Sequence, residues 1–383
     1  MELARAHAGN GTPAAPDIAV VDFASFTAAT WNEVPTRHRT PMQQHIWARA
    51  AAETLSPHAP VLVVTVGPPQ RPIAMAPLAR SVSGPARLCL LGAEELGESV
   101  EVVYQSEKAL EALADGLSGM GLAVGFGHYL ADTPLTAALR RAYRGRGMVV
   151  AKPLATRGSP YITLDASWIE PEQHFSARRR SDLRRMQRNA EKLGTVSVQI
   201  IEPSPEALGP LLDEAIDIEA KGWKGRAGTA MSVDRRLERF YRRYAQLACE
   251  AGILRLCFLR IAGKAVAMQL AVETEGRFWL FKIGYDEAYA RCSPGNLLMR
   301  ETIRYAARRQ LESYEFLGKE APWTELWTTA AHPITALRTY PANLAGLAAV
   351  FADCGHRAKQ LFARLAARRS DQHPIVKPSL SDA

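Results

Sequence analysis

The segment from Phe278 to Gly318 constrains the fold of this 383-residue chain most strongly. It begins with an aromatic and apolar run, Phe278 to Ile283, whose composition is typical of a buried strand. A loop containing Ser293-Pro294-Gly295 follows, and from Leu297 the apolar residues recur at nearly helical spacing. Tyr314 to Leu317 has the composition of another short strand. A strand that leads through a glycine-bearing loop into a helix N-terminus is a common anion site, because unpaired N–H groups and the helix dipole face the anion. This pattern alone is equally compatible with a purely structural turn.

The size and composition predict about two soluble domains with short tails. Apolar residues make up 47% of the chain and charged residues 22%, which is ordinary for a globular protein. The five cysteines are scattered and odd in number, so we expect reduced thiols in a cytoplasmic protein. The first residues have no apolar core, and no apolar run approaches the roughly 18 residues of a membrane span, so we expect neither a signal peptide nor a spanning helix. The nine histidines form no cluster with metal-ligand spacing, so we predict no metal site.

The formal net charge of +8 is concentrated in two expected helices. Residues 178–192 carry seven Arg or Lys against two acids, and residues 356–370 carry five without any acid. The first run is interpreted as a solvated helix face or as a contact to an anionic donor or acceptor, and least as a DNA site, because no DNA-reading motif is present. The second run leaves a peripheral contact with a membrane surface open.

Read in order, the sequence predicts a mixed pattern of strands and helices in both parts of the chain. In the second part, a long helix from about Pro171 to Leu193 precedes a strand, two further helices and three meander strands that end at Ile283. Trp323 to Thr328 and Ile334 to Tyr340 are expected as closing strands. The predicted organisation is a disordered tail over 1–16, a first domain over 17–167, a second over 168–342, a basic amphipathic helix over 343–369 and a disordered tail over 370–383.

This order resembles the GNAT acyltransferase superfamily, and more closely its tandem branch of CelD-like proteins and Fem-type aminoacyl transferases. The resemblance covers about residues 40–340 and rests on blocks in the same order. These blocks are the helical entry Phe175 to Arg185, Gly222-Trp223-Lys224-Gly225 with Gly228-Thr229-Ala230, Gly284-Tyr285-Asp286-Glu287 with Ser293-Pro294-Gly295, and Glu315-Phe316-Leu317-Gly318 with Pro322-Trp323. The resemblance implies an α/β (α+β) fold of two tandem GNAT-like domains, each a mixed, largely antiparallel sheet flanked by helices, with a degenerate first domain.

The resemblance also implies that the loop before the expected helix holds the pyrophosphate of acetyl-CoA or another acyl-CoA as co-substrate. The residues that would do so are Arg291, Ser293, Gly295, Asn296 and Leu297. The loop departs from the usual GNAT pattern, since Pro294 and Asn296 stand where glycine and glycine or alanine are usual. Pro294 has no N–H to offer a phosphate, which leaves the N–H groups of the following residues.

Acyl transfer to an amine requires a polarised carbonyl, a base for the amine and a stabilised leaving group. Asp286 or Glu287, at the end of the expected central strand, is a candidate base; the alternative is a solvated turn residue. Glu315 is a third candidate, with a capping or ion-pair role as its alternative. Tyr285 is a candidate general acid for the leaving thiolate, although such tyrosines are more often packing residues.

Four further residues are candidates for substrate contacts. Lys282 lies inside an apolar strand and must face a cleft, an acid or solvent at an edge. Trp223 and Lys224 lie in a glycine-rich loop that is either a lid or a rigid helix–helix connection. Trp323 is expected in the core or in the wall of the cleft.

The leading functional hypothesis is a cytoplasmic N-acyltransferase that moves an acyl group, acetyl by resemblance, from acyl-CoA to an amine. The acceptor would be a small molecule or a precursor of the cell envelope or of polysaccharide biosynthesis. One alternative is Fem-type aminoacyl transfer from aminoacyl-tRNA, and tRNA is a partner only under that alternative. Another is a non-catalytic GNAT-fold binding protein. The sequence specifies neither the acceptor nor the oligomeric state.

Overall fold

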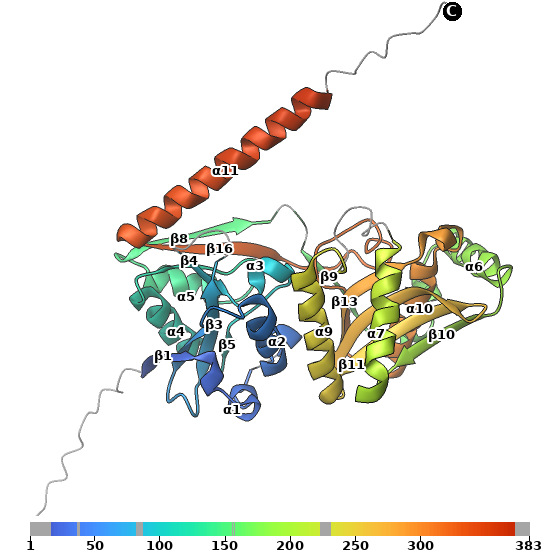
Figure 1. Cartoon of the computed structure of the whole chain (residues 1–383), viewed down its shortest axis with the longest axis horizontal. Helices are drawn as coiled ribbons and strands as arrows, with labels where there is room; N and C mark the ends of the chain where they lie inside the picture. The colour runs from blue at the N-terminus through green and yellow to red at the C-terminus, as the bar shows by residue number, and fades with distance from the viewer. Residues whose placement is uncertain are drawn as a thin grey trace, which may run out of the picture.

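The computed structural model describes residues 17–36, 39–81, 87–154, 156, 158–222 and 231–371. Two mixed sheets lie side by side, each covered by helices (Figure 1). The predicted disordered tails, 1–16 and 370–383, lie outside the described residues except for the last two residues of the final helix.

The first sheet consists, within the described residues, of nine strands that are mostly antiparallel. Its order is β1 (Ile18–Asp22), β2 (Leu62–Val66), β3 (Ala74–Arg80), β4 (Arg87–Leu90), β6 (Ala123–Gly125), β16 (Ile334–Pro341) and β7 (Tyr129–Leu130), with β5 (Val103–Tyr104) on β3 and β8 (Gly147–Pro153) on β16. The helices of this half are α1 (Ala28–Asn32), α2 (His45–Leu55), α3 (Ala93–Leu96), α4 (Glu107–Gly119) and α5 (Leu135–Ala142).

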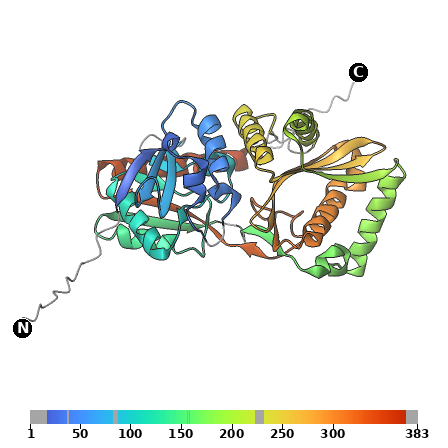
Figure 2. The same ribbon diagram turned by 90° about the horizontal axis from the view of Figure 1, so that it is seen from below.

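The second sheet has seven described strands and lies between two helical layers. Its order is β10 (Val196–Ile201), β11 (Leu254–Ile261), β12 (Lys264–Thr274), β13 (Arg277–Tyr285), β14 (Ser313–Glu315), β9 (Ser159–Thr163) and β15 (Ala331–His332). Helices α7 (Pro205–Ala220) and α9 (Arg235–Glu250) cover one face, and α6 (Ala177–Glu191) and α10 (Pro294–Arg308) cover the other (Figure 2). The predicted fold class, two tandem halves built on mixed and largely antiparallel sheets, is confirmed.

Two strands pair in a different sheet from the one expected from the predicted domain boundary at residue 167. Strand β9 lies in the predicted first domain but pairs with β14 in the second sheet, and β16 lies in the predicted second domain but pairs with β8 in the first sheet. The two sheets therefore exchange one strand each, and the predicted domain limits stay a prediction. Residues 323–328, expected as a strand, form turns instead, because Thr324 Oγ1 accepts the Ala321 N–H at 3.0 Å and donates to the Ala321 carbonyl.

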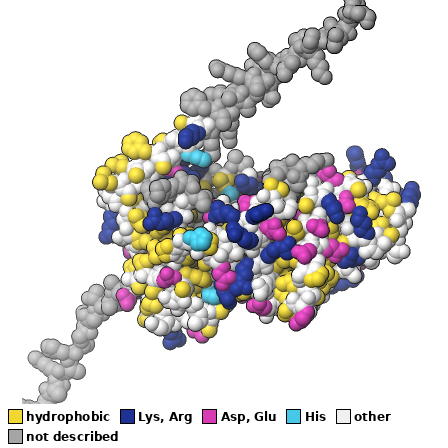
Figure 3. All heavy atoms as spheres, viewed as in Figure 1, with side chains coloured by type: hydrophobic (Ala, Val, Ile, Leu, Met, Phe, Trp, Pro, Cys, Tyr) yellow, Lys and Arg dark blue, Asp and Glu magenta, His cyan; other side chains and the backbone are white. Residues whose placement is uncertain are grey.

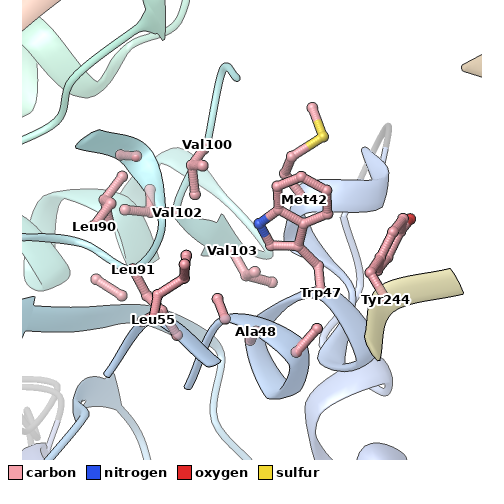
Figure 4. Packing of buried hydrophobic residues seen from close by; sticks show 14 of the residues in the cluster. Met42, Trp47, Ala48, Leu55, Leu90, Leu91, Val100, Val102, Val103 and Tyr244 are labelled. Carbon is pink, nitrogen blue, oxygen red and sulfur yellow. The ribbon is translucent and has the colours of Figure 1, made fainter. Parts of the chain in front are cut away.

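The hydrophobic core is continuous between the two halves. Trp47 of α2 is 1% exposed and contacts Phe240 and Tyr244 of α9 edge-on, with ring centroids 4.8 and 5.0 Å away. Figure 4 shows this indole between neighbours of the first half and Tyr244. Aromatic burial of this kind makes it costly to separate the halves.

Helix α11 (Leu344–Asp371) extends away from both sheets (Figure 1). Its base is fixed by Asp353, which accepts hydrogen bonds from Arg87 Nη2 at 2.5 Å, Tyr340 Oη at 2.5 Å and Arg338 Nη1 at 2.6 Å. Leu344 and Phe351 are 84% and 75% exposed, which is compatible with the predicted membrane contact, and that contact stays a prediction. Among the described residues, no helix combines the length and apolar composition that crossing a bilayer requires.

Replacing Asp353 with asparagine is expected to lower the free energy of unfolding at pH 7 by about 2 kcal/mol. Burial alone would raise the pKa of Asp353, but the hydrogen bonds and positive charges of its partners outweigh it and lower the pKa to about 2 from the usual 3.8. The stabilisation is therefore fully present above pH 3.8 and is lost as the pH falls toward 2. Urea unfolding at pH 7 and along an acid series measures both effects. The control is Asp213→Asn, since the Arg242–Asp213 pair is exposed and worth less than about 1 kcal/mol. Equal losses in the two variants would contradict the prediction.

Candidate active site

A cavity forms where strand β13 parts from β14. The two strands pair in parallel only from Arg277 to Trp279, while β13 continues to Tyr285. A bulge bends β13 here, because Leu270 pairs with Lys282 and Ala271 with Leu280, which leaves Phe281 as the extra residue. The gap opens into a cavity of about 250 Å³, called the splay cavity below. Its walls are Glu219, Gly222, Met268, Gln269, Ile283, Gly284, Tyr285, Ala290, Ser293, Gly295, Asn296, Met299 and Trp323.

The N-terminus of α10 forms one wall of the splay cavity. Ser293 adopts a left-handed conformation with φ of 46°, and Pro294 follows at the first helical position. The Asn296 and Leu297 N–H groups donate to the Ser293 carbonyl at 3.0 and 3.3 Å, so the turn already uses them. Within the described residues, the Gly295 N–H is the group of this turn left for a ligand.

The predicted cofactor residues separate into two groups. Ser293, Gly295 and Asn296 line the splay cavity. Leu297 is fully buried in the core, and Arg291 is exposed at the end of a short 3-10 helix (Glu287–Cys292) away from the cavity walls.

Glu219 is a buried carboxylate in the splay cavity that sequence reasoning missed. It lies at the end of α7, is 1% exposed, and its Oε2 accepts the Met231 N–H at 2.8 Å. The available signal was its helical phase, since Leu212, Ala215 and Ile216 place position 219 on the apolar face of α7. An acid on such a face is costly to bury and marks a candidate functional group.

Two glycines allow α7 to lie directly against the end of β13. A Cβ at Gly284 would lie 2.6 Å from the Cα of Glu219, and a Cβ at Gly222 would lie 3.0 Å from the Tyr285 carbonyl oxygen. The close approach places the Glu219 carboxylate and the end of the splayed strand in one cavity.

Among the predicted catalytic residues, only Tyr285 lines the splay cavity. Asp286 is 8% exposed, accepts the Ala288 N–H at 3.0 Å and pairs with Lys264 Nζ at 3.3 Å, so it caps the 3-10 helix that follows. Glu287 is partly buried in the first turn of that helix and is not in the cavity wall.

Glu315 lies in a different cavity. It is 2% exposed, and its carboxylate accepts Ser313 Oγ at 2.6 Å and contacts His332 Nε2 at 3.2 Å.

The predicted substrate-binding residues do not all lie in the splay cavity. Trp323 lines the splay cavity and contacts Phe316 edge-on, with ring centroids 5.9 Å apart. Lys282 Nζ lies 4.3 Å from the centroid of the Tyr241 ring of α9, a cation–π contact outside the cavity wall. Trp223 and Lys224 lie outside the described residues.

The arginine-rich helix α6 presents Arg178, Arg184 and Arg188 to solvent. Figure 3 shows Lys and Arg side chains gathered at the end of the molecule that carries α6. The helix reaches the loop before α10, where Asn189 Nδ2 donates to the Arg291 carbonyl at 3.5 Å. Positive charge at this place attracts anionic ligands toward the α10 turn.

Comparisons with known proteins agree with this geometry. The model of the acetyltransferase (GNAT) domain family Acetyltransf_6 matches residues 177–325. No curated protein matches the chain in sequence.

Solved structures share the fold across both halves. FemX is similar with a TM-score of 0.55 at 12% identity, over 84% of this chain and 96% of that chain. The C-terminal domain (DUF2156) of a putative lysylphosphatidylglycerol synthetase from Agrobacterium fabrum is similar with a TM-score of 0.51 at 13% identity, over 86% and 95%. A conserved protein of unknown function from Bacteroides thetaiotaomicron is similar with a TM-score of 0.50 at 12% identity, over 84% and 99%. At these identities the likeness shows the fold alone.

Proposed function

We propose that this protein is an N-acyltransferase that moves an acyl group from acyl-CoA to an amine, because the model of the GNAT acetyltransferase domain family matches residues 177–325. The observation that carries the proposal is the splay cavity, where a parted strand, a helix N-terminus and a buried carboxylate meet. Acetyl is the proposed acyl group, and a small-molecule or cell-envelope amine is the proposed acceptor.

The acyl-CoA pyrophosphate would lie against the α10 turn, with the Gly295 N–H and the helix dipole facing it. Its thioester would then enter the gap between β13 and β14. Ser293 and Asn296 line the path, and Trp323 shields it from water.

Glu219 is the proposed base, because it is the carboxylate among the cavity walls. The amine nitrogen forms a bond to the thioester carbonyl carbon and gives its proton to Glu219, and the carbon–sulfur bond breaks. Tyr285 is the proposed donor of a proton to the departing thiolate, because its side chain is in the same wall. Glu219 is proposed as the base in place of Asp286 and Glu315, because Asp286 caps the 3-10 helix that follows it and Glu315 lies in another cavity.

Fem-type aminoacyl transfer from aminoacyl-tRNA is the second candidate function. The exposed arginines of α6 favour a polyanionic donor, and a tRNA offers more phosphates to them than CoA does. A binding protein without turnover is the third.

Isothermal titration with acetyl-CoA, longer acyl-CoAs and desulfo-CoA separates these functions. Binding of acyl-CoA, followed by transfer to an amine, supports the proposal, and absence of binding to every CoA species overturns it. Label transfer to an amine that depends on aminoacyl-tRNA supports the second function. Binding without turnover supports the third.

Replacing Gly295 with aspartate is expected to weaken CoA binding about tenfold, or ~1.4 kcal/mol, because a carboxylate would face the pyrophosphate. The backbone tolerates a side chain here, since the nearest atom to a Cβ is Tyr285 Cδ1 at 3.7 Å. An acid in the first turn also suits the helix dipole, so the fold is retained. Titration calorimetry compares this variant with Gly209→Asp, which adds the same charge on α7 where no atom lies within 4 Å. Equal affinity in the two variants would place the phosphates elsewhere.

A further inference from the structure

A second cavity lies between the two halves, and the proposed acyl transfer does not use it. Its volume is about 390 Å³, and it shares no lining residue with the splay cavity. The first half contributes Thr36, Gln43 and Glu101, and the second contributes Trp279, Glu315 and His332. This feature is called the inter-half cavity below.

Glu101 contributes to this cavity a buried carboxyl group, one oxygen of which has no partner among the described residues. It is 8% exposed, and within the described residues its Oε1 atom makes no hydrogen bond. Burial, and then the negative charge of Asp132, raise the pKa of Glu101 to about 8. Buried polar atoms nearly always have partners, so an unpaired carboxyl oxygen in a cavity indicates a missing cation or donor.

The other charged groups of the cavity already have partners. Glu315 is held by Ser313 and His332, and the His332 ring stacks on Tyr161 with centroids 4.0 Å apart. Arg277 Nη2 lies 3.5 Å from Glu312 Oε2. Among the described residues, the titratable groups that act on the Glu101 carboxyl are Tyr104, Tyr129 and Asp132, and none of these three carries positive charge.

Hydroxyl and amide side chains line the same cavity as this carboxyl. Thr40, Ser99, Thr133 and Ser159 line the same cavity, and Thr36 Oγ1 is a second buried atom without a partner within the described residues. Such a wall suits a ligand with hydroxyl groups of its own. An anionic ligand is disfavoured because the negative charge of Asp132 would repel it.

We propose that the inter-half cavity binds a hydroxylated primary amine, of the amino alcohol or amino sugar class, whose ammonium group pairs with Glu101. The hydroxyl groups of the ligand would bond with the threonine and serine side chains of the wall. The site is separate from the splay cavity, so it stands or falls independently of the acyl transfer.

The test is calorimetric titration of the full chain with 5-amino-1-pentanol and with 1,5-pentanediol, which has a hydroxyl in place of the amine. At pH 7 the amine is expected to bind at least about tenfold more tightly than the diol. Titrations in two buffers of different ionisation enthalpy should show that close to one proton is released for each amine bound. Glu101, with a pKa of about 8, is mostly protonated at pH 7 and must ionise to pair with the ammonium group. The affinity for the amine should rise about 50-fold from pH 6 to pH 8, since an alkylamine of pKa ~10 stays charged over this range.

Glu101→Gln should remove both the preference for the amine and the rise with pH, whereas Glu107→Gln, an exposed change at the start of α4, should alter neither. Circular dichroism checks that the variants are folded, and the proton count on the wild type tests the proposal without any variant. Equal affinity for amine and diol, or binding without proton release, would overturn the proposal. Retention of the amine preference in folded Glu101→Gln would do the same.

Discussion

Replacing Glu219 with glutamine is expected to lower kcat by about 10²- to 10⁴-fold, with little change in KM for the acyl donor. Glutamine cannot accept the proton that the attacking amine loses, yet its amide oxygen can still accept the Met231 N–H that Glu219 Oε2 accepts at 2.8 Å. The variant should therefore fold and bind the donor while it loses the chemical step. Steady-state kinetics with an amine that the wild type acylates gives both constants.

The matched control is Asp217→Asn, which removes a carboxylate two residues away on the exposed side of α7. It should leave kcat within about twofold of the wild type, since surface changes away from a site have small effects. The kcat of Glu219→Asp should lie between those of the wild type and Glu219→Gln, because the carboxylate remains but its side chain is shorter by one methylene. Wild-type turnover in Glu219→Gln, with the thermal midpoint unchanged, would remove Glu219 from the mechanism.

Sequence reasoning recovered the segment from Phe278 to Gly318 well, since its elements are local. The predicted strand, helix and second strand correspond to β13, α10 and β14. The family match over residues 177–325 supports the resemblance to the GNAT superfamily, and FemX shares the fold across both halves. Motifs fixed by turn and cap chemistry are readable from short windows.

Features that depend on long-range contacts were not readable in this way. The exchange of β9 and β16 joins strands that are distant along the chain, and no local pattern encodes it. Asp286 has the position expected of a base at a strand end, but its carboxylate caps the next turn and pairs with Lys264. Glu219 was hidden because α7 reaches β13 only in the folded chain, where Gly284 admits its backbone.

Replacing Gly284 with alanine is expected to lower the free energy of unfolding by about 3 kcal/mol or more. The new Cβ would lie 2.6 Å from the Glu219 Cα and 3.1 Å from the Glu219 backbone nitrogen. Backbone atoms cannot rotate away as a side chain does, so α7 must move from β13 or β13 must bend. Urea unfolding of the full chain measures the loss.

The control for this change is Gly209→Ala on the same helix, where a Cβ meets no atom within 4 Å. Alanine there should stabilise the protein by about 0.5–1 kcal/mol, because glycine in a helix interior is entropically costly. The two substitutions add the same methyl group and are expected to change stability in opposite directions, which separates the close approach from any general effect of glycine.

Any movement of α7 in Gly284→Ala also displaces Glu219 from the splay cavity, so kcat should fall even in the fraction that stays folded. Wild-type stability in Gly284→Ala would show that α7 does not lie against β13 at this position, and the assignment of Glu219 to the site would lose its geometric basis.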